Sequence, residues 1–383
     1  MSPPGRQPSS VDAAARLAVW PSGRPFSPRT AQSRRPNSSA RPSRLEPSQR
    51  GVRVPHGRRN SGGGKMGKTG VIIAVLALLL ALAAAALYRP DIPYAELEAK
   101  YAVPTSKYVD LPGGVRMHYR DDGDPAGPVV MLVHGFGDSF LSWDGWIQRL
   151  SPDFRVITID LPGHGLTRAP AGYRPSQDDY ADLVDALAAK LNLPPFAIAG
   201  NSMGGGVAWQ VAVRYPQRLS ALVLVDAAGW PASTLAKPPL AFRIMGSPVG
   251  IFLLKHFETR PITGPALKAD VVDKALITPA FVDRWVAVQR APGHRDILMG
   301  MRPGKNSAAS EAVLAKITAP TLVLHGDQDV IIKPESGRRF AAAIPGARLI
   351  LYPNAGHLPQ LDVPERSASD VAAFLKSAAK APA

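Results

Sequence analysis

From about residue 101 onward, short apolar runs alternate with segments whose apolar residues have helical spacing, and this alternation constrains the fold more than any other feature. The apolar runs lie at residues 115–119, 129–133, 155–159, 196–199, 222–225, 321–324 and 349–351. The helical segments lie at residues 143–150, 178–191, 204–215, 335–343 and 367–379. Because parallel strands need helical crossovers, this order predicts an α/β domain over residues 101–383, with a mostly parallel sheet covered by helices on both faces.

The alternation stops between about residues 229 and 310. This stretch contains prolines and apolar residues at helical spacing, but no run that is typical of a strand. It therefore predicts a helical lid, inserted into the α/β domain at about residues 229–310.

A separate apolar segment precedes the domain. Residues 71–87 are apolar without interruption, and because roughly 20 apolar residues span a bilayer, residues 70–88 predict a single transmembrane anchor. Lys65 and Lys68 precede it, which favours a cytoplasmic N-terminus. The anchor would then lie in a bacterial inner membrane, with the α/β domain outside the cytoplasm. The alternative is a secreted or periplasmic protein, because the small residues at 83–86 resemble a signal-peptide cleavage site.

Residues 1–65 hold most of the net positive charge. Thirteen basic residues stand there against Asp12 and Glu46, a net of +11 out of +15, so the remainder carries only +4. The sparse apolar residues of this extension predict disorder, and the small charge elsewhere argues against nucleic-acid binding. The extension also has the composition of a targeting peptide or a lipid-binding tail. A further hypothesis is that translation starts at Met66, because a leader typical of bacterial membrane proteins begins there.

Two further features exclude functions. Residues 62–69 match the phosphate-loop pattern G-x-x-x-x-G-K-[ST], but no strand precedes them and a membrane-type helix follows, so we expect no nucleotide site. The chain has no cysteine, which excludes disulfides, thiolate metal sites and a cysteine nucleophile.

Residues 200–204 read Gly-Asn-Ser-Met-Gly and join a predicted strand to a predicted helix. The pattern G-x-S-x-G in this setting predicts a nucleophile elbow, a turn so sharp that side chains at its two glycines would clash. Ser202 would be held there with its hydroxyl exposed above the sheet. The Met203 amide, at a helix N-terminus, would face a developing oxyanion.

A base and an acid are expected later in the chain, because the order in this architecture is serine, acid, histidine. Of eight histidines only His357 follows Asp329, and it lies just beyond the last predicted strand. We expect His357 to be the base and Asp329 to orient its imidazole. Asp327 and Asp226 are the alternative acids, with Asp226 in reserve because it ends the preceding strand.

Residues 134–137, His-Gly-Phe-Gly, follow another predicted strand. Their glycines let the loop fold close over the elbow, so the Phe136 amide is expected as the second oxyanion donor, with its ring lining a pocket. An ordinary strand-to-helix turn is the alternative. The tight turn at residues 160–165 is interpreted as structural support.

Together these segments resemble the α/β-hydrolase superfamily over about residues 107–380, and the whole from Met66 resembles a membrane-anchored bacterial group with a helical lid. The resemblance implies hydrolysis of an ester or related acyl bond (EC 3.1.1 type, carboxylesterase or lipase) through an acyl-enzyme on Ser202, with no cofactor and no metal. Ser202 stands where haloalkane dehalogenases and epoxide hydrolases of this fold carry an aspartate. Carbon–carbon bond hydrolases are similar around Ser202, but usually carry a Gly-Pro-Gly type loop where residues 136–139 read Phe-Gly-Asp-Ser.

Apolar residues in the lid indicate a small or medium apolar ester as substrate. They are Phe242, Ile244, Met245, Ile251, Phe252, Leu253, Leu254, Phe257, Trp285, Leu298 and Met299. We expect Phe136, Trp285, Phe252 and Phe257 to contact it, in a monomer. Three other functions are kept: a carbon–carbon bond hydrolase or cofactor-free perhydrolase on the same triad, a catalytically inactive membrane-tethered binding protein, and a membrane scaffold acting through the basic extension.

Overall fold

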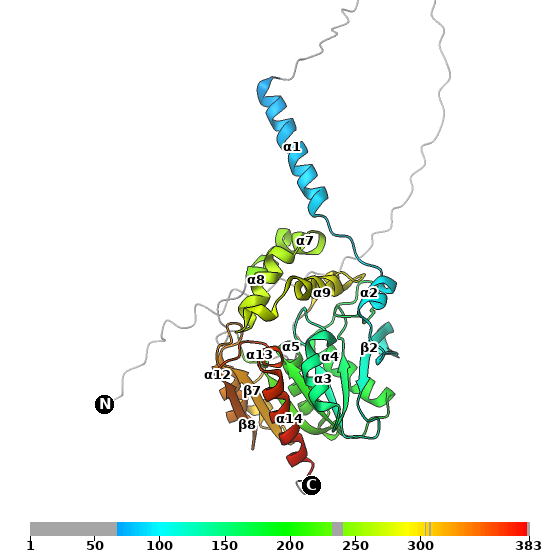
Figure 1. Cartoon of the computed structure of the whole chain (residues 1–383), viewed down its shortest axis with the longest axis vertical. Coiled ribbons are helices and arrows are strands. Elements are labelled where there is room, and N and C mark those ends of the chain that lie inside the picture. The colour runs from blue at the N-terminus through cyan, green and yellow to red at the C-terminus, as the bar shows by residue number, and fades with distance from the viewer. Residues whose placement is uncertain (1–66, 232–239, 303, 306–307, 381–383) are drawn as a thin grey trace, which may run out of the picture. The chain divides into compact units, whose positions relative to one another are not determined.

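The seven apolar runs form seven strands of an eight-stranded sheet, whose order is β1-β2-β4-β3-β5-β6-β7-β8 (Figure 1). The strands are β1 (Ser106–Leu111), β2 (Val115–Asp122), β3 (Val129–Val133), β4 (Arg155–Ile159), β5 (Phe196–Asn201), β6 (Leu219–Val225), β7 (Thr321–Gly326) and β8 (Arg348–Tyr352). β2 pairs antiparallel with β1 and β4, and every other pairing is parallel. The prediction of a mostly parallel α/β sheet is therefore confirmed.

The computed structural model describes residues 67–231, 240–302, 304–305 and 308–380, without the side chains at 241 and 242. The predicted extension at residues 1–65, most of the phosphate-loop-like pattern and the side chain of Phe242 lie outside the described residues. The apolar pattern predicts neither β1 nor the helix α2 (Tyr94–Tyr101).

Helices cover both faces of the sheet because the central strands are apolar on both sides. Along β3, Val129, Met131 and Val133 join the core that α4, α5 and α12 cover, while Val130 and Leu132 join the core under α3 and α14. This is the period of two that a pleated strand imposes. The covering helices are α3 (Asp144–Leu150), α4 (Gln177–Lys190), α5 (Met203–Arg214), α12 (Pro334–Ala343) and α14 (Pro364–Ala378).

Between β6 and β7 the described chain leaves the sheet and forms helices only, in the segment where the sequence predicts a lid. They are α6 (Leu240–Met245), α7 (Pro248–His256), α8 (Arg260–Asp270), α9 (Pro279–Gln289), α10 (His294–Gly300) and the short α11 (Glu311–Leu314). Several begin with a side-chain cap, such as Ser247 accepting from the Gly250 amide and Thr278 from the Phe281 amide. Such caps satisfy amides that have no partner within the helix. We call α6 to α10 the lid.

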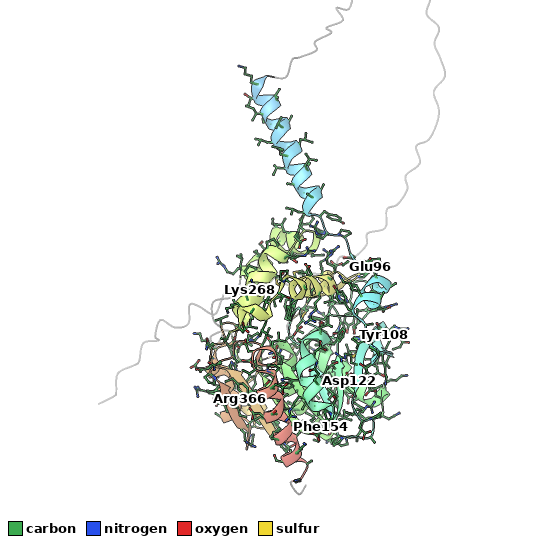
Figure 2. All side chains as sticks on the ribbon, in the orientation of Figure 1. Glu96, Tyr108, Asp122, Phe154, Lys268 and Arg366 are labelled. Carbon is green, nitrogen blue, oxygen red and sulfur yellow. The ribbon has the colours of Figure 1, made fainter. Side chains whose placement is uncertain are left out.

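The apolar segment before the domain forms the helix α1 (Lys68–Leu87), with no buried residue. Its side chains project from the ribbon, and no other described segment surrounds them (Figure 2). Among the described helices it is long and apolar enough to cross a membrane, with a mean hydropathy of 2.9. A helix that is apolar on every side and buried by no protein segment is what a bilayer accommodates.

Candidate active site

The parallel strands deliver the predicted site residues to one edge of the sheet, because carboxyl ends of parallel strands lie at the same edge. Residues 134–137 follow β3, Ser202 follows β5, Asp329 follows β7 and His357 follows β8. Segments that are far apart in sequence therefore meet above the centre of the sheet.

Ser202 lies in a strained turn. Its φ of 52° and ψ of −115° belong to a region that residues other than glycine rarely adopt. A Cβ atom at Gly200 would lie 2.1 Å from the Gly204 carbonyl oxygen, and one at Gly204 would lie 2.2 Å from the Val133 carbonyl oxygen. Both flanking glycines are therefore required by the close approach of β5, α5 and β3. This is the geometry of a nucleophile elbow.

Backbone hydrogen bonds hold this conformation in place. The Ser202 amide donates to the Val225 carbonyl at 2.9 Å, while its own carbonyl accepts from Gly206 at 3.0 Å and from Ala228 at 2.9 Å. The strained residue is thus fixed by β6 as well as by its own helix.

His357 and Asp329 are in direct contact and both are buried. Nδ1 of His357 lies 2.7 Å from Oδ2 of Asp329, while Oδ1 of Asp329 accepts from the amides of Ile331 and Ile332 at 2.7 and 2.9 Å. A carboxylate bound in this way orients the ring and stabilises its protonated form. The predicted acid is thus beside the predicted base.

The two groups shift each other's pKa in opposite directions. Burial alone raises the pKa of Asp329, but the charge of His357 and the hydrogen bonds from His325 and His357 outweigh it and lower the pKa. Burial alone lowers the pKa of His357, but the charge and hydrogen bond of Asp329 outweigh it and raise the pKa above 6.5. The structure therefore favours an ionised Asp329 and a His357 that binds protons readily.

The loop of His357 is tied both to the elbow and to the lid. Nδ2 of Asn201 donates to the His357 carbonyl at 3.0 Å, and the His357 amide donates to the carbonyl of Asp270, the last residue of α8, at 2.7 Å. Because Asn201 immediately precedes Ser202, its side chain fixes the distance between the elbow and the histidine loop. Ser202 and His357 line one cavity, which we call the inner cavity.

Asp226, the reserve acid, takes part in a buried network behind Asp329. Its Oδ1 accepts from the Gly326 amide at 2.9 Å and lies 3.4 Å from Nε2 of His325, which in turn lies 3.5 Å from Oδ2 of Asp329. Nε2 of His325 lies 3.0 Å from the Ile332 carbonyl, so this nitrogen carries a hydrogen. That hydrogen makes the cluster a hydrogen-bonded network and unsuited to a metal ion, although its ligand atoms lie within 4.8 Å of one another.

The two alternative acids occupy different surroundings. Burial and the charge of Asp329 raise the pKa of Asp226 well above its usual range, so of the two carboxyls Asp226 holds its proton more readily. Asp327 is exposed. Asp329 is therefore the carboxyl that the structure brings to His357.

The loop at residues 134–137 lies against the elbow. A Cβ atom at Gly135 would be 3.3 Å from Cβ of Ser202, and the Gly137 carbonyl accepts from Nε2 of Gln289 in α9 at 2.8 Å. Phe136 lies between them and lines the inner cavity. The structure thus brings Phe136 beside Ser202. Met203, the residue after Ser202, is the first residue of α5.

The inner cavity adjoins a second, outer cavity under the lid. Four residues line both: Phe136, Ala266, Asp270 and Trp285. Phe257 lines the outer cavity only. Phe252 lines neither of the two, because it lies on the outward face of α7 with 55% of its surface exposed. Of the four predicted substrate contacts, the structure places three along this path and one outside it.

Sequence reasoning misses two acidic residues of the inner cavity, Asp138 and Asp270. Burial raises the pKa of Asp138 to about 7, against hydrogen bonds from Ser142 and Ser139 that lower it. Burial raises the pKa of Asp270 to about 6, against the charge of His357. Asp270 comes from the lid, and no local motif marks it.

A second Ser-His-Asp arrangement occurs away from this cavity. Nε2 of His118 lies 2.8 Å from Oγ of Ser106, and its Nδ1 lies 2.7 Å from Oδ2 of Asp160. Ser106 opens the edge strand β1, and it is not among the residues that line the inner cavity. The Asp160 carboxylate also accepts from the amides of Phe140 and Leu166. This network holds β1, β2 and the turn at residues 160–165 together, which agrees with the interpretation of that turn as structural support.

A mostly parallel sheet with a serine elbow after β5 and a helical insertion between β6 and β7 defines an α/β-hydrolase fold. This chain belongs to the alpha/beta hydrolase family, whose profile matches residues 130–370.

Relatives in this family act on different bonds. The 2-hydroxymuconate semialdehyde hydrolase of Pseudomonas sp. (strain CF600) is 29% identical over 273 residues, which cover 70% of this chain and 93% of that protein. Lipase 1 of Psychrobacter immobilis is 28% identical over 279 residues, covering 70% and 83%. Among solved structures, a membrane phospholipase A described as a bacterial virulence factor has a TM-score of 0.63 at 26% identity, covering 81% of this chain and 99% of that one. Family membership therefore establishes that this chain belongs to a class of hydrolases. The kind of bond that it cleaves has to be inferred from the site.

Proposed function

We propose that this chain is a membrane-anchored serine esterase that cleaves ester or related acyl bonds of apolar substrates through an acyl-enzyme on Ser202. The observation that carries the proposal is the strained Ser202, with φ of 52°, lining the same cavity as the His357–Asp329 pair. Strain of this kind persists where it presents a reactive group.

The proposed reaction has two halves. His357 removes the proton of the Ser202 hydroxyl while the oxygen attacks the substrate carbonyl, and His357 then gives that proton to the leaving alcohol. In the second half, water gives a proton to His357 and attacks the acyl carbon, which releases the acid and restores the Ser202 hydroxyl. Asp329 stays ionised throughout and stabilises the imidazolium.

The amides of Met203 and Phe136 are proposed to hold the oxyanion of each tetrahedral intermediate. Met203 is the first residue of α5, where amides lack partners within the helix and the helix dipole favours negative charge. Phe136 lies on the loop that approaches Ser202 through Gly135. Removal of one such donor typically costs about 10²–10³ in rate.

An apolar acyl substrate is supported by the side chains along the cavities. Phe136 and Trp285 line both cavities, and Leu254, Phe257 and Met299 line the outer one. Two similar proteins are named a lipase and a phospholipase A, and these names denote enzymes that act on esters with apolar acyl chains. Carbon–carbon bond hydrolysis is less favoured because residues 136–139 differ from the loop usual in hydrolases of that kind.

The anchor is proposed to be α1, with the catalytic domain outside the cytoplasm of a bacterial inner membrane. Its 20 residues rise about 30 Å, which matches the hydrocarbon core of a bilayer. Lys68 at its start favours a cytoplasmic N-terminal side.

Fluorophosphonate labelling tests the nucleophile. We expect the full chain in membranes to be labelled, and Ser202→Ala to remove the label and the turnover of p-nitrophenyl butyrate. The matched control is Ser106→Ala, which removes the serine of the second Ser-His-Asp arrangement and should leave both readouts intact. A probe that does not cross membranes, added to spheroplasts, should label the enzyme if its domain faces outward.

Three results would contradict the proposal. Labelling that persists in Ser202→Ala places the nucleophile elsewhere, and labelling lost in Ser106→Ala would point to that serine. Folded protein that neither labels nor turns over esters supports the inactive binding protein.

A further inference from the structure

We propose that the lid rests in the surface layer of the bilayer that α1 crosses, and that acyl substrates pass from the membrane through the outer cavity to Ser202. The contact surface is the apolar face of α6 and α7 formed by Leu240, Val249, Phe252 and Leu253, which we call the lid ridge. This inference rests on the proposed function and adds to it the source and class of the substrate, an acyl ester resident in a lipid bilayer.

The lid ridge is unusual for its exposure. Its members have 57%, 69%, 55% and 47% of their surface exposed, in chain order. Among the described residues after Tyr88, the other large apolar side chains exposed to a similar degree are Leu276 and Val330, which stand singly. Val249, Phe252 and Leu253 follow the spacing i, i+3, i+4, so they share one face of α7. An exposed apolar face of this kind marks a contact surface.

The contacts between α7 and the end of α1 indicate that the lid ridge faces lipid. Tyr88, the residue after α1, pairs as a β-bridge with Phe257 and stacks on His256 at a ring separation of 6.5 Å. Phe252 in turn lies 4.7 Å from His256 and 6.0 Å from Phe257, between ring centres. One layer of rings therefore connects Tyr88 to the lid ridge.

Backbone bonds hold the same junction. The Glu258 amide donates to the Leu87 carbonyl at 2.9 Å, and the Arg89 amide donates to the His256 carbonyl at 2.8 Å. The segment that leaves the membrane is thus bonded to the C-terminal end of α7.

The depth of α7 follows from these contacts. If α1 fills the hydrocarbon core with its 20 residues, then Leu87 and Tyr88 lie at the boundary with the headgroups, where tyrosine is enriched. A helix in ring contact with Tyr88 lies at the same boundary. An amphipathic helix at that depth buries its apolar face about 5–10 Å into the lipid.

Charges near the lid ridge are compatible with a lipid surface. Glu258 is paired with Arg89 at 2.7 Å, Asp91 is paired with Arg295 at 2.6 Å, and Asp296 is paired with Lys255. Because each of these carboxylates has a basic partner, they oppose an anionic headgroup layer less than free carboxylates would.

The outer cavity connects this surface to the nucleophile. Arg89 and Phe257 line it on the side of the α1 junction, and Phe136 and Trp285 line it where it adjoins the inner cavity. It encloses about 960 Å³ of space outside the atoms, a figure that includes open solvent. An acyl chain that enters beside the lid ridge can therefore reach Ser202 along apolar side chains such as Phe257, Trp285 and Phe136.

Depth measurement tests the docking without relying on catalysis. The chain has no cysteine, so Val249→Cys, Leu253→Cys and the control Lys190→Cys each carry a single label. Lys190 is exposed at the end of α4, toward the opposite edge of the sheet. The full chain, with Ser202→Ala added, is reconstituted in phosphatidylcholine–phosphatidylglycerol vesicles with or without brominated chains. We expect brominated lipid to quench the two ridge labels at least about twofold more than the Lys190 label.

Two outcomes overturn the docking. Ridge labels that are quenched no more than the Lys190 label show that the lid stands in water. Ridge labels that are protected equally in both lipids, with disulfide cross-links between Val249→Cys copies, show that a second copy covers the ridge. Because Ser202→Ala is used throughout, these outcomes are independent of whether Ser202 is the nucleophile.

The substrate route is tested by activity in a protein with intact Ser202. Val249→Asp combined with Leu253→Asp is expected to lower turnover of a vesicle-embedded ester about tenfold or more and that of p-nitrophenyl butyrate less than about twofold. Leu276→Asp, an equally apolar exposed lid residue outside the ridge, is the matched control and should change neither. Equal loss on both esters, or no loss on either, contradicts entry from the membrane.

Discussion

The His357–Asp329 pair makes the proposed base dependent on its acid partner. The charge of Asp329 raises the pKa of His357 above 6.5 against the effect of burial, with smaller contributions from Asp270 and Asp138. His357 accepts the serine proton only when neutral. Its protonation therefore links the rate to pH through the surrounding carboxylates.

The pH profile of kcat/KM for p-nitrophenyl butyrate checks this linkage. We expect the rate to rise with pH through a midpoint above 6.5, because His357 must lose its proton. Asp329→Asn should move the midpoint to lower pH and reduce the rate by roughly 10⁴, since it removes the charge that raises the pKa and orients the ring. Asp327→Asn, at an exposed neighbouring carboxyl, should change neither. A midpoint that stays in place in Asp329→Asn assigns the titration to another group.

Asp226 should keep its proton to a higher pH than an ordinary aspartate does. Because its folded pKa lies well above its usual range, the native state keeps a proton that the unfolded chain releases, so stability falls as pH rises above about 4. Asp226→Asn removes this loss. We expect the variant to keep kcat/KM within about threefold, and its advantage in melting temperature over the unmodified chain to grow from about pH 5 to about pH 8. A rate loss as large as that of Asp329→Asn would mean that Asp226 acts as an ionised acid.

For single residues of the site, the sequence predicts those that belong to a local motif. It misses those that only the folded chain brings into the inner cavity. Ser202 and the loop of Phe136 follow apolar strands, and chain order selects His357 and Asp329. Asp270 joins them from the lid and Asp138 lines the same cavity, although neither belongs to a motif. Their roles depend on burial, which sequence spacing does not contain.

The elbow is the element with the least room for change. A Cβ at Gly204 meets backbone oxygens of β3 and its loop at 2.2 and 2.5 Å, and backbone cannot move aside as a flexible side chain can. We expect Gly204→Ala to lower the free energy of unfolding by about 1–3 kcal/mol and to abolish fluorophosphonate labelling. Urea unfolding in detergent measures the first effect.

The control for this change is Gly300→Ala, at the end of α10. Its Cβ would meet only the Arg174 side chain, at an ordinary 3.8 Å. It should change the free energy of unfolding by less than about 0.5 kcal/mol and leave labelling intact. Equal effects of the two substitutions would remove the argument that the turn requires glycine.

Strands buried on both faces were predictable, and the more exposed edge strand β1 was not. β3 and β4 have the predicted bounds because every residue of β3 and nearly every residue of β4 is buried, which demands a continuous apolar run. β1 is an edge strand with only one buried residue, and exposed polar residues such as Lys107 and Asp110 interrupt any apolar run in its sequence. The position of β4 between β2 and β3 is set by pairing between distant segments, which no local pattern encodes.

At the scale of the whole molecule, the lid is both part of the site and part of the proposed membrane contact. α8 and α9 supply Asp270 and Trp285 to the inner cavity, while α6 and α7 carry the lid ridge. The sequence predicts a lid from its missing strands and an anchor from its apolar run. Their junction through Tyr88 and Phe257 depends on tertiary structure, so the two predictions remain separate until the fold joins them.

One set of hydrogen bonds at the end of α8 limits how this enzyme could be recombined with its relatives. The carboxylate of Asp362 accepts from Gly356 in the histidine loop and from Val272 after the lid helix, both at 2.8 Å, beside the bond from His357 to Asp270. A chimaera that exchanges only residues 230–269 keeps this joint. A chimaera whose exchanged segment extends past residue 269 must also take residue 362 from the same parent. Otherwise the bonds of Asp362 are lost, His357 is displaced, and a change in the rate of the hybrid no longer reflects its new pocket alone.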